Sequence, residues 1–164
     1  TGGKQMLSYN EQFQLALELA VKKHKGQTDK SGNPYILHPL HVMENVKSKD
    51  AKIVAILHDV IEDTDVDSEY LLEIGLSQHL RYVVIVQFQA STHIVDVVVL
   101  LTRYDPKQDY QEYIKNLSSN KLAKEVKLAD LMHNMDLKRL PSLTERDLDR
   151  NRKYQIAYHY LINC

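Results

Sequence analysis

Residues 54–64 constrain the fold more than any other stretch, because they set four polar side chains into an otherwise apolar segment. At helical period the apolar residues form two adjacent rows, which make a band wide enough to bury. The polar positions are His58, Asp59, Glu62 and Asp63, and their spacing brings an imidazole and three carboxylates onto the same two helical turns. We therefore predict a core helix that carries a chemically dense face.

Two interpretations of this face are open from the segment alone. Carboxylates beside a buried surface are costly unless they are paired or bind a cation. A His-Asp pair with further carboxylates close by supplies the ligands of a hydrolytic metal site. The same residues also fit an amphipathic helix with a solvated acidic end.

Length and charge limit the class of protein. A chain of 164 residues fits one domain with a substantial core. Lys and Arg number 21 against 22 Asp and Glu, so the overall charge does not indicate a nucleic acid or membrane partner. The only cysteine, Cys164, excludes an internal disulfide and favours a reducing cytoplasm. We predict one cytoplasmic domain over residues 9–164, with a tag or disordered N-terminus at residues 1–8.

The first forty residues predict two helices joined by a turn-rich loop. A capping pattern at Ser8 opens a helix over residues 9–25, and the loop that follows has room for a short hairpin at residues 28–36. Pro39 suits the first turn of the second helix, which would place His38 at its N-cap. A ring fixed at that position could point into the bundle.

The later segments are also predicted to be helical. Residues 82–88 and 94–101 are rich in β-branched side chains, and propensity alone favours a hairpin. We interpret them as buried helices, because an isolated two-stranded sheet in a helical chain has little support. Further helix starts are indicated by Asp50, Asp105 with Pro106, Asn120 and Thr144, and the last two helices are expected to end near Leu140 and Ile162. The expected fold is an all-α, single-domain bundle.

Asp130 lies in a second chemically dense segment. Its helix has apolar flanks, and Asn134 follows one turn later near the same face. The plain interpretation pairs Asp130 with Lys127 or Arg139, as most helix carboxylates are paired.

Together these residues resemble a known family. His38, then His58-Asp59, then Asp130 resembles the H…HD…D signature of HD-domain metal-dependent phosphohydrolases. More specifically, roughly residues 9–160 are similar to the RelA/SpoT-type hydrolase domain, especially its stand-alone small alarmone hydrolases. The blocks that carry the similarity are Gly26-Gln27, Pro34-Tyr35-Ile36, His38-Pro39, Leu57-His58-Asp59, Glu62-Asp63-Thr64, Lys127-Leu128-Ala129-Asp130 and His133-Asn134.

The resemblance implies an HD-type helical bundle that removes the 3′-pyrophosphate of guanosine or adenosine tetra- and pentaphosphate, the alarmones of the stringent response. It implies one divalent ion, usually Mn²⁺, and the mixed nitrogen and oxygen donors also suit Fe²⁺ or Zn²⁺. The expected partner is a small-molecule nucleotide, with no nucleic acid and no membrane, and the oligomeric state is left open.

The same resemblance assigns roles to individual residues. The implied metal ligands are His38, His58, Asp59 and Asp130. Glu62 and Asp63 would orient or deprotonate the attacking water. The implied substrate-binding residues are Lys30, Asn134, Arg150 and Tyr154.

The chain departs from the family pattern at Asp29. The family usually has an Arg here that packs on the purine, so the preference for guanine or adenine is left open. Asp29 fits either a turn residue that bonds its own backbone or a contact to the base. Residues 78–92 have no clear family counterpart, and His79 and His93 lack the motif context of a second metal site.

Two other functions are consistent with parts of the pattern. The first is an HD-domain nucleotidase that acts on ordinary nucleoside phosphates, which is the alternative to the alarmone hydrolase. The third function, after these two hydrolases, is a metal-free domain that binds nucleotide or a partner as a regulator. The intact set of ligands and carboxylates argues against the third, because a degenerate regulator would be expected to have lost at least one of them.

Overall fold

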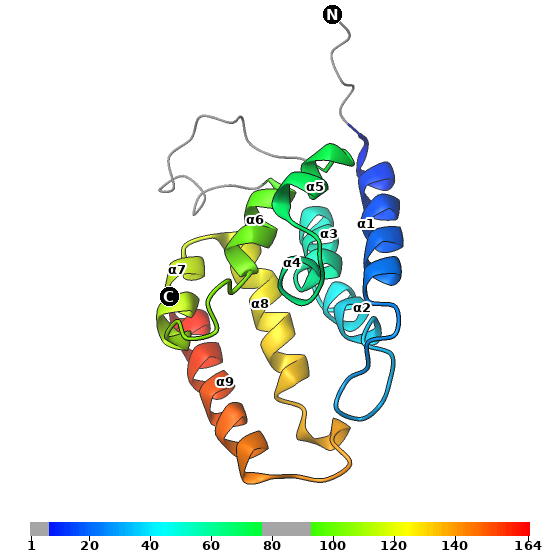
Figure 1. The fold of residues 1–164 in the computed structure, drawn as a ribbon. Coiled ribbons are helices and arrows are strands. Elements are labelled where there is room, and N and C mark those ends of the chain that lie inside the picture. Colours follow the sequence, from blue (N-terminus) through cyan, green and yellow to red (C-terminus); the bar gives the residue numbers. More distant parts are fainter. Residues whose placement is uncertain (1–6, 77–92) are drawn as a thin grey trace, which may run out of the picture.

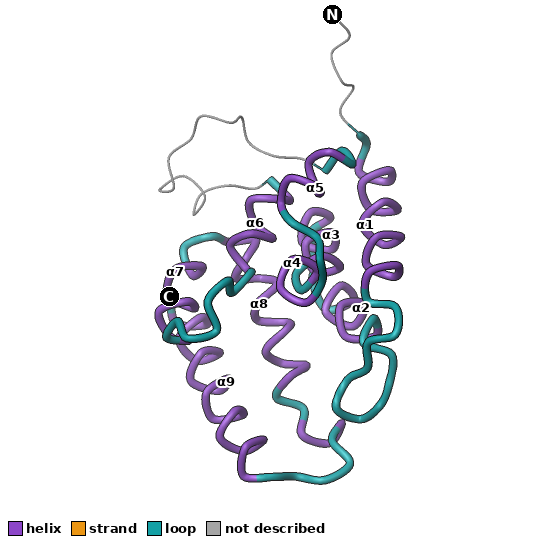
Figure 2. Tube along the Cα trace, viewed as in Figure 1, coloured by secondary structure: helices purple, strands orange, loops and turns teal. Residues whose placement is uncertain are grey.

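The computed structural model describes residues 7–76 and 93–164, and its elements within these ranges are helices (Figures 1 and 2). The predicted all-α class is therefore confirmed. The predicted helix at residues 82–88 and the segment 78–92 lie outside the described residues. The helices are α1 Tyr9–Lys23, α2 Leu37–Glu44, α3 Lys49–Leu57, α4 Val60–Asp63, α5 Ser68–Glu73, α6 Ile94–Leu101, α7 Tyr110–Ser118, α8 Lys121–Asn134 and α9 Glu145–Asn163, with a 3-10 helix at Leu137–Arg139.

Helix α3 forms the centre of the core. Its side chains from Ile53 to Leu57 are at most 1% exposed. It packs against α1 and α2 on one side and against α6 and α8 on the other (Figure 1). Helix α9 packs against α8 and α7 and completes the bundle. A helix surrounded in this way needs apolar residues on nearly every face, which explains the broad apolar band in the sequence.

Local capping explains where several helices begin. Ser8 and Thr144 form capping boxes with Glu11 and Asp147, and Asn120 accepts a hydrogen bond from the Ala123 amide, as predicted. Helix α6 at Ile94–Leu101 also confirms the helical interpretation of that β-branched run.

Three predicted helix boundaries are wrong. Ser48, not Asp50, caps α3, because its hydroxyl accepts from the Ala51 amide at 3.2 Å. Helix α7 begins after Asp109, whereas Asp105 closes a separate turn. Helix α8 ends at Asn134 rather than near Leu140, because Asp136 caps a new 3-10 turn.

The two segments that carry the candidate ligands also differ from the prediction. The central helix is interrupted at His58 and Asp59, which form the turn between α3 and α4. His38 is the second residue of α2 and not its N-cap, which is Ile36. Pro39 is tolerated at the third position, because amides in the first turn have no intrahelical partner. The loop before α2 contains an isolated bridge between Thr28 and Pro34 rather than a hairpin of strands.

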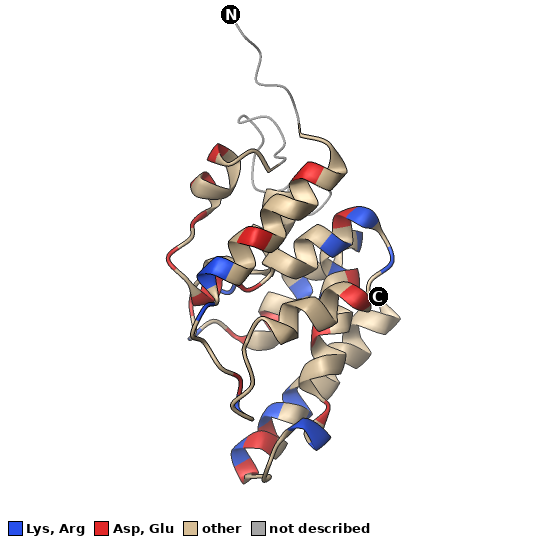
Figure 3. Ribbon diagram, turned by 90° about the vertical axis from the view of Figure 1, so that its right-hand side faces the viewer, with Lys and Arg blue, Asp and Glu red and all other residues tan. Residues whose placement is uncertain are grey.

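Charged residues of both signs are interspersed along the first turns of α9 (Figure 3). In the described part of the chain, no helix combines the length and apolarity needed to cross a bilayer. The cytoplasmic location and the absence of nucleic acid and membrane partners stay predictions.

Candidate metal centre

Three parts of the fold bring the predicted ligands together. His38 comes from α2, His58 and Asp59 from the turn after α3, and Asp130 from α8. His38 Nε2 lies 3.0 Å from Asp130 Oδ1 and 3.6 Å from Asp59 Oδ2. His58 Nε2 lies 3.0 Å from Asp59 Oδ2 and 3.6 Å from Asp130 Oδ1. Each imidazole nitrogen therefore lies within 3.6 Å of an oxygen of both aspartates, at one point between these elements.

The His58 ring is oriented with its Nε2 lone pair toward this point. Its Nδ1 lies 2.7 Å from the Ala55 carbonyl oxygen, which can only accept, so Nδ1 carries the proton in the neutral ring. His58 Nε2 is buried and has no hydrogen-bond partner among the described residues. A lone pair that faces carboxylate oxygens requires a proton or a cation between them.

His38 is oriented by His133, a residue whose supporting role the sequence did not reveal. The Nδ1 atoms of the two rings lie 2.6 Å apart. Burial and the nearby Arg139 lower the pKa of His133 to about 4, so His133 is neutral near pH 7 and can accept the His38 proton. This arrangement leaves His38 Nε2 free to face the carboxylates.

The carboxylates of the site are held ionised. Burial opposes ionisation of Asp130, but Lys127 at 2.8 Å and the two imidazoles hold its pKa well below the usual range. Burial likewise opposes ionisation of Asp59, and His58 lowers its pKa to about 2. In the same way, burial would lower the pKa of His58, but Asp59 and Asp130 raise it well above the usual range. The site therefore attracts positive charge, as a proton or as a metal ion.

The donor set fits a divalent metal ion. Among the described residues, ligand atoms of His38, His58 and Asp130 all lie within 4.8 Å of one another, and all three residues are buried. Asp59 adds a second carboxylate on the same side. Mixed imidazole and carboxylate ligands suit Mn²⁺, Fe²⁺ or Zn²⁺.

Glu62 and Asp63 lie one turn beyond the candidate ligands, and both line a cavity. Partial burial and the charge of Asp59 raise the pKa of both carboxyl groups above their usual range. Glu62 Oε2 accepts a hydrogen bond from the Arg103 amide at 2.9 Å, which orients the carboxylate. A carboxylate with a raised pKa beside a hydrolytic centre is suited to accept a proton.

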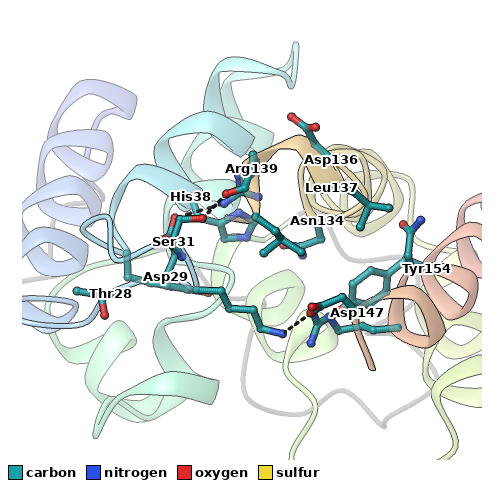
Figure 4. A pocket seen from close by; sticks show the side chains of 15 residues that line it. Thr28, Asp29, Ser31, His38, Asn134, Asp136, Leu137, Arg139, Asp147 and Tyr154 are labelled. Carbon is teal, nitrogen blue, oxygen red and sulfur yellow. Dashed lines mark hydrogen bonds and ion pairs between the residues drawn. The ribbon is translucent and has the colours of Figure 1, made fainter. Parts of the chain in front are cut away.

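Two cavities adjoin the candidate centre. The larger has a volume of about 400 Å³ and lies between the loop before α2, the 3-10 helix and α9 (Figure 4). The smaller, of about 270 Å³, is lined by Asp59, Glu62, Asp63 and Asp130 together with residues of α7 and α9. Tyr35, His38, Asn134 and Tyr154 line both cavities, so the centre lies where the two adjoin.

The predicted substrate-binding residues gather in the larger cavity. Lys30, Asn134, Arg150 and Tyr154 all line it. Lys30 Nζ lies 3.5 Å from Asp147 Oδ1, and Arg150 pairs with the same carboxylate. Asn134 donates to Asp130 Oδ1 at 2.8 Å, so it also supports a candidate ligand.

Asp29 has the contacts of a turn residue. Its Oδ1 accepts hydrogen bonds from the amides of Ser31 and Asn33, each at 2.9 Å. Its Oδ2 lies 3.6 Å from Arg139 Nη2, and both side chains line the larger cavity (Figure 4). Of the two partners predicted for Asp130, the structure pairs it with Lys127. Arg139 faces Asp29 instead, and no feature of the sequence indicated that contact.

Several named proteins have sequences similar to part of this chain. No protein-family model matches the chain. A Myxococcus xanthus protein named GTP pyrophosphokinase is 32% identical over 130 residues, which cover 71% of this chain and 16% of the relative. A Haemophilus influenzae protein named guanosine-3′,5′-bis(diphosphate) 3′-pyrophosphohydrolase is 33% identical over 129 residues, covering 71% of this chain and 17% of the relative. An Aquifex aeolicus protein of the same name is 43% identical over 67 residues, which cover 38% of this chain and 10% of the relative. The chain thus spans less than a fifth of the length of these relatives.

The fold is shared with a solved structure. That structure, described as a metazoan ortholog of SpoT that hydrolyzes ppGpp and plays a role in starvation responses, superposes with a TM-score of 0.69. The match covers 96% of this chain and 88% of the other at 23% sequence identity. The helical bundle and its His, His-Asp and Asp cluster define an HD domain. Together with the sequence relatives, they identify the chain as a RelA/SpoT-type HD domain.

Proposed function

We propose that this chain is a metal-dependent hydrolase that removes the 3′-pyrophosphate of guanosine or adenosine tetra- and pentaphosphate. The observation that carries the proposal is the buried convergence of two oriented imidazoles on two ionised carboxylates, with His58 Nε2 lacking a hydrogen-bond partner. The printed names of two relatives, guanosine-3′,5′-bis(diphosphate) 3′-pyrophosphohydrolase, support the substrate class. The partner is accordingly a small-molecule nucleotide.

The centre holds one divalent ion in this proposal. Its ligands are His38, His58, Asp59 and Asp130, and Mn²⁺ is the proposed ion. When bound, such an ion neutralises charge on a phosphoryl group and lowers the pKa of water. Lys127 and Asn134 hold Asp130 in place, and Tyr35 donates to Asp59 Oδ2 at 2.5 Å.

Glu62 and Asp63 are the proposed proton acceptors. Water adds to the 3′-phosphorus and gives its proton to one of these carboxylates. The bond from phosphorus to the ribose 3′-oxygen breaks, and that oxygen keeps the electron pair and takes up a proton. The products are a nucleoside 5′-diphosphate or 5′-triphosphate with a free 3′-hydroxyl, and inorganic pyrophosphate.

The larger cavity is the proposed site of the nucleoside. Lys30 and Arg150 supply cations there, and Tyr154 and Asn134 connect it to the centre. Asp147 holds both cations in place, so a phosphate oxygen meets donors that are already positioned.

The decisive experiment is a product analysis. Manganese-loaded protein is incubated with 3′-pyrophosphorylated and with ordinary nucleotides, and the products are separated by chromatography. Pyrophosphate released only from the first group would support the proposal. Orthophosphate released from ordinary nucleotides would support the nucleotidase alternative, and no turnover of either group would contradict both.

A further inference from the structure

The smaller cavity has a wall of cations and phenols, and only one of the cations, Lys127, contacts a candidate metal ligand. Arg103, Lys127 and Lys153 line it, together with Tyr110 and Tyr113. Lys127 is neutralised by Asp130, at 2.8 Å. The candidate centre does not account for the side chains of the other two cations, Arg103 and Lys153.

Lys153 is held in place without being neutralised. Its Nζ lies 4.6 Å from the centroid of the Tyr110 ring and 5.7 Å from that of Tyr154. No carboxylate of the described residues lies within ion-pair distance of it. Burial, then repulsion from Arg103, Arg150 and Lys127, lowers its pKa. An anion bound between these cations would relieve that repulsion.

Two hydrogen-bond donors beside Lys153 also lack partners. The Tyr110 hydroxyl and Arg103 Nε are buried, and neither has a hydrogen-bond partner within the described part of the chain. The Arg103 guanidinium is fixed by the carbonyl oxygens of Pro106, at 2.7 Å, and Gln108. Buried donors without partners are rare, and a cluster of them indicates an acceptor supplied by a ligand.

The carboxylates of the same cavity are engaged elsewhere. Asp130 and Asp59 face the imidazoles, and Glu62 accepts from the Arg103 amide. Asp63 is the last residue of α4, one turn beyond Asp59. Among the described residues, no carboxylate of this cavity pairs with the side chain of Arg103, Tyr110 or Lys153, and these three side chains form the donor side of the cavity. An anionic group fits the donor side.

We propose that the smaller cavity receives the terminal phosphate of the scissile pyrophosphate, with Lys153, Tyr110 and Arg103 as its direct contacts. This inference rests on the proposed function. The bond from the 3′-phosphorus to the ribose oxygen breaks, while the bond between the two phosphates remains intact. The nucleoside then stays in the larger cavity, and pyrophosphate leaves from the smaller one.

Binding of inorganic pyrophosphate tests the proposal without turnover. Isothermal titration calorimetry would compare pyrophosphate, orthophosphate and guanosine 5′-diphosphate on the manganese-loaded protein, with excess manganese present. Lys153→Met and Tyr110→Phe keep the size of each side chain but remove the charge or the hydroxyl. Arg152→Met is the matched control, because it removes a cation from the exposed face of α9 outside both cavities.

Lys153→Met is expected to weaken pyrophosphate binding by about tenfold or more, and Tyr110→Phe by about threefold to tenfold. Guanosine 5′-diphosphate should bind both variants about as tightly as the parent, and Arg152→Met should leave all three affinities unchanged. Thermal denaturation checks that each variant is folded.

Two results would overturn the site. One is parental pyrophosphate affinity in folded Lys153→Met and Tyr110→Phe proteins. The other is orthophosphate binding as tight as pyrophosphate binding, which would indicate a general anion site. If pyrophosphate binds as expected but no 3′-pyrophosphorylated nucleotide is hydrolysed, the proposed function fails while the site remains.

Discussion

Asp130 is the most heavily engaged carboxylate of the candidate centre. Lys127 and Asn134 each bond it at 2.8 Å, and His38 Nε2 lies 3.0 Å away. Its removal would leave the buried Lys127 ammonium without its partner, which is strongly destabilising by itself. Asp59 is less enclosed, with a side chain that is 19% exposed, and is therefore the better position at which to test ligand function.

We expect Asp59→Ala to lose bound metal while keeping its fold. The substitution removes a charged ligand and leaves a divalent cation undercompensated. Metal content after gel filtration is the measurement, and Asp65→Ala, which removes an exposed carboxylate paired with Lys23, is the control. An unchanged metal content in Asp59→Ala would exclude this residue as a ligand.

Glu62→Gln should separate metal binding from turnover. The amide oxygen can still accept from the Arg103 amide, so the local structure and the metal should be retained. Loss of the proton acceptor should lower kcat by about a hundredfold or more. The two readouts are metal content and kcat, and full activity would remove Glu62 from the mechanism.

At the scale of elements, Asp29 joins the loop before α2 to the 3-10 helix after α8. Its carboxylate bonds two amides of its own turn and faces Arg139, while the Ser31 hydroxyl donates to the Arg139 carbonyl oxygen. These contacts shape one wall of the larger cavity (Figure 4). The two segments are more than a hundred residues apart in the chain. This wall therefore forms through tertiary contacts and not through contacts between sequence neighbours.

Asp29→Asn and Asp29→Ala should differ in stability. Asn keeps an acceptor for the two amides, whereas Ala leaves both without a partner, at a cost of about 1–2 kcal/mol in the free energy of unfolding. Urea unfolding of the two variants measures the difference. Equal stability of both variants and the parent would show that the turn does not depend on this carboxylate.

For the whole molecule, metal binding should add stability that depends on pH. An ion present at about a hundred times its dissociation constant stabilises the folded state by roughly 2.7 kcal/mol. For a domain of this size, that corresponds to an increase in Tm of about 5–10 °C. Thermal denaturation with manganese and with a chelator measures the shift, and Asp59→Ala should abolish it.

The sign of the pH dependence follows from His58. Without metal, Asp59 and Asp130 raise its pKa, so the stability from the protonated ring is fully present below the ordinary value of about 6.5 and is lost as pH rises through the raised value. Protons compete with metal for the same nitrogen, so the metal-induced increase in Tm should grow as pH rises. An increase in Tm that becomes smaller toward higher pH would contradict metal binding at His58.

Local rules predicted much of the architecture. The capping residues Ser8, Asn120 and Thr144 and the apolar period of α3 act within one or two turns, so the sequence is sufficient to locate them. The predicted start of α3 was wrong because Ser48 and Asp50 are both residue types that cap helices. Glu125 of α8 accepts from the amides of Lys47 and Ser48, and this tertiary contact is consistent with the start at Ser48.

The sequence by itself determined the all-α class and the candidate ligands, because helical period and the ordered His, His-Asp and Asp blocks are properties of short segments. Only the tertiary structure decided which other side chains reach the centre. Arg103 lies in a loop, and Tyr110 and Lys153 lie on the surfaces of α7 and α9, where no sequence pattern distinguishes them. Whether a cation faces solvent or a cavity depends on how α7, α8 and α9 pack, and that packing combines contacts from distant parts of the chain.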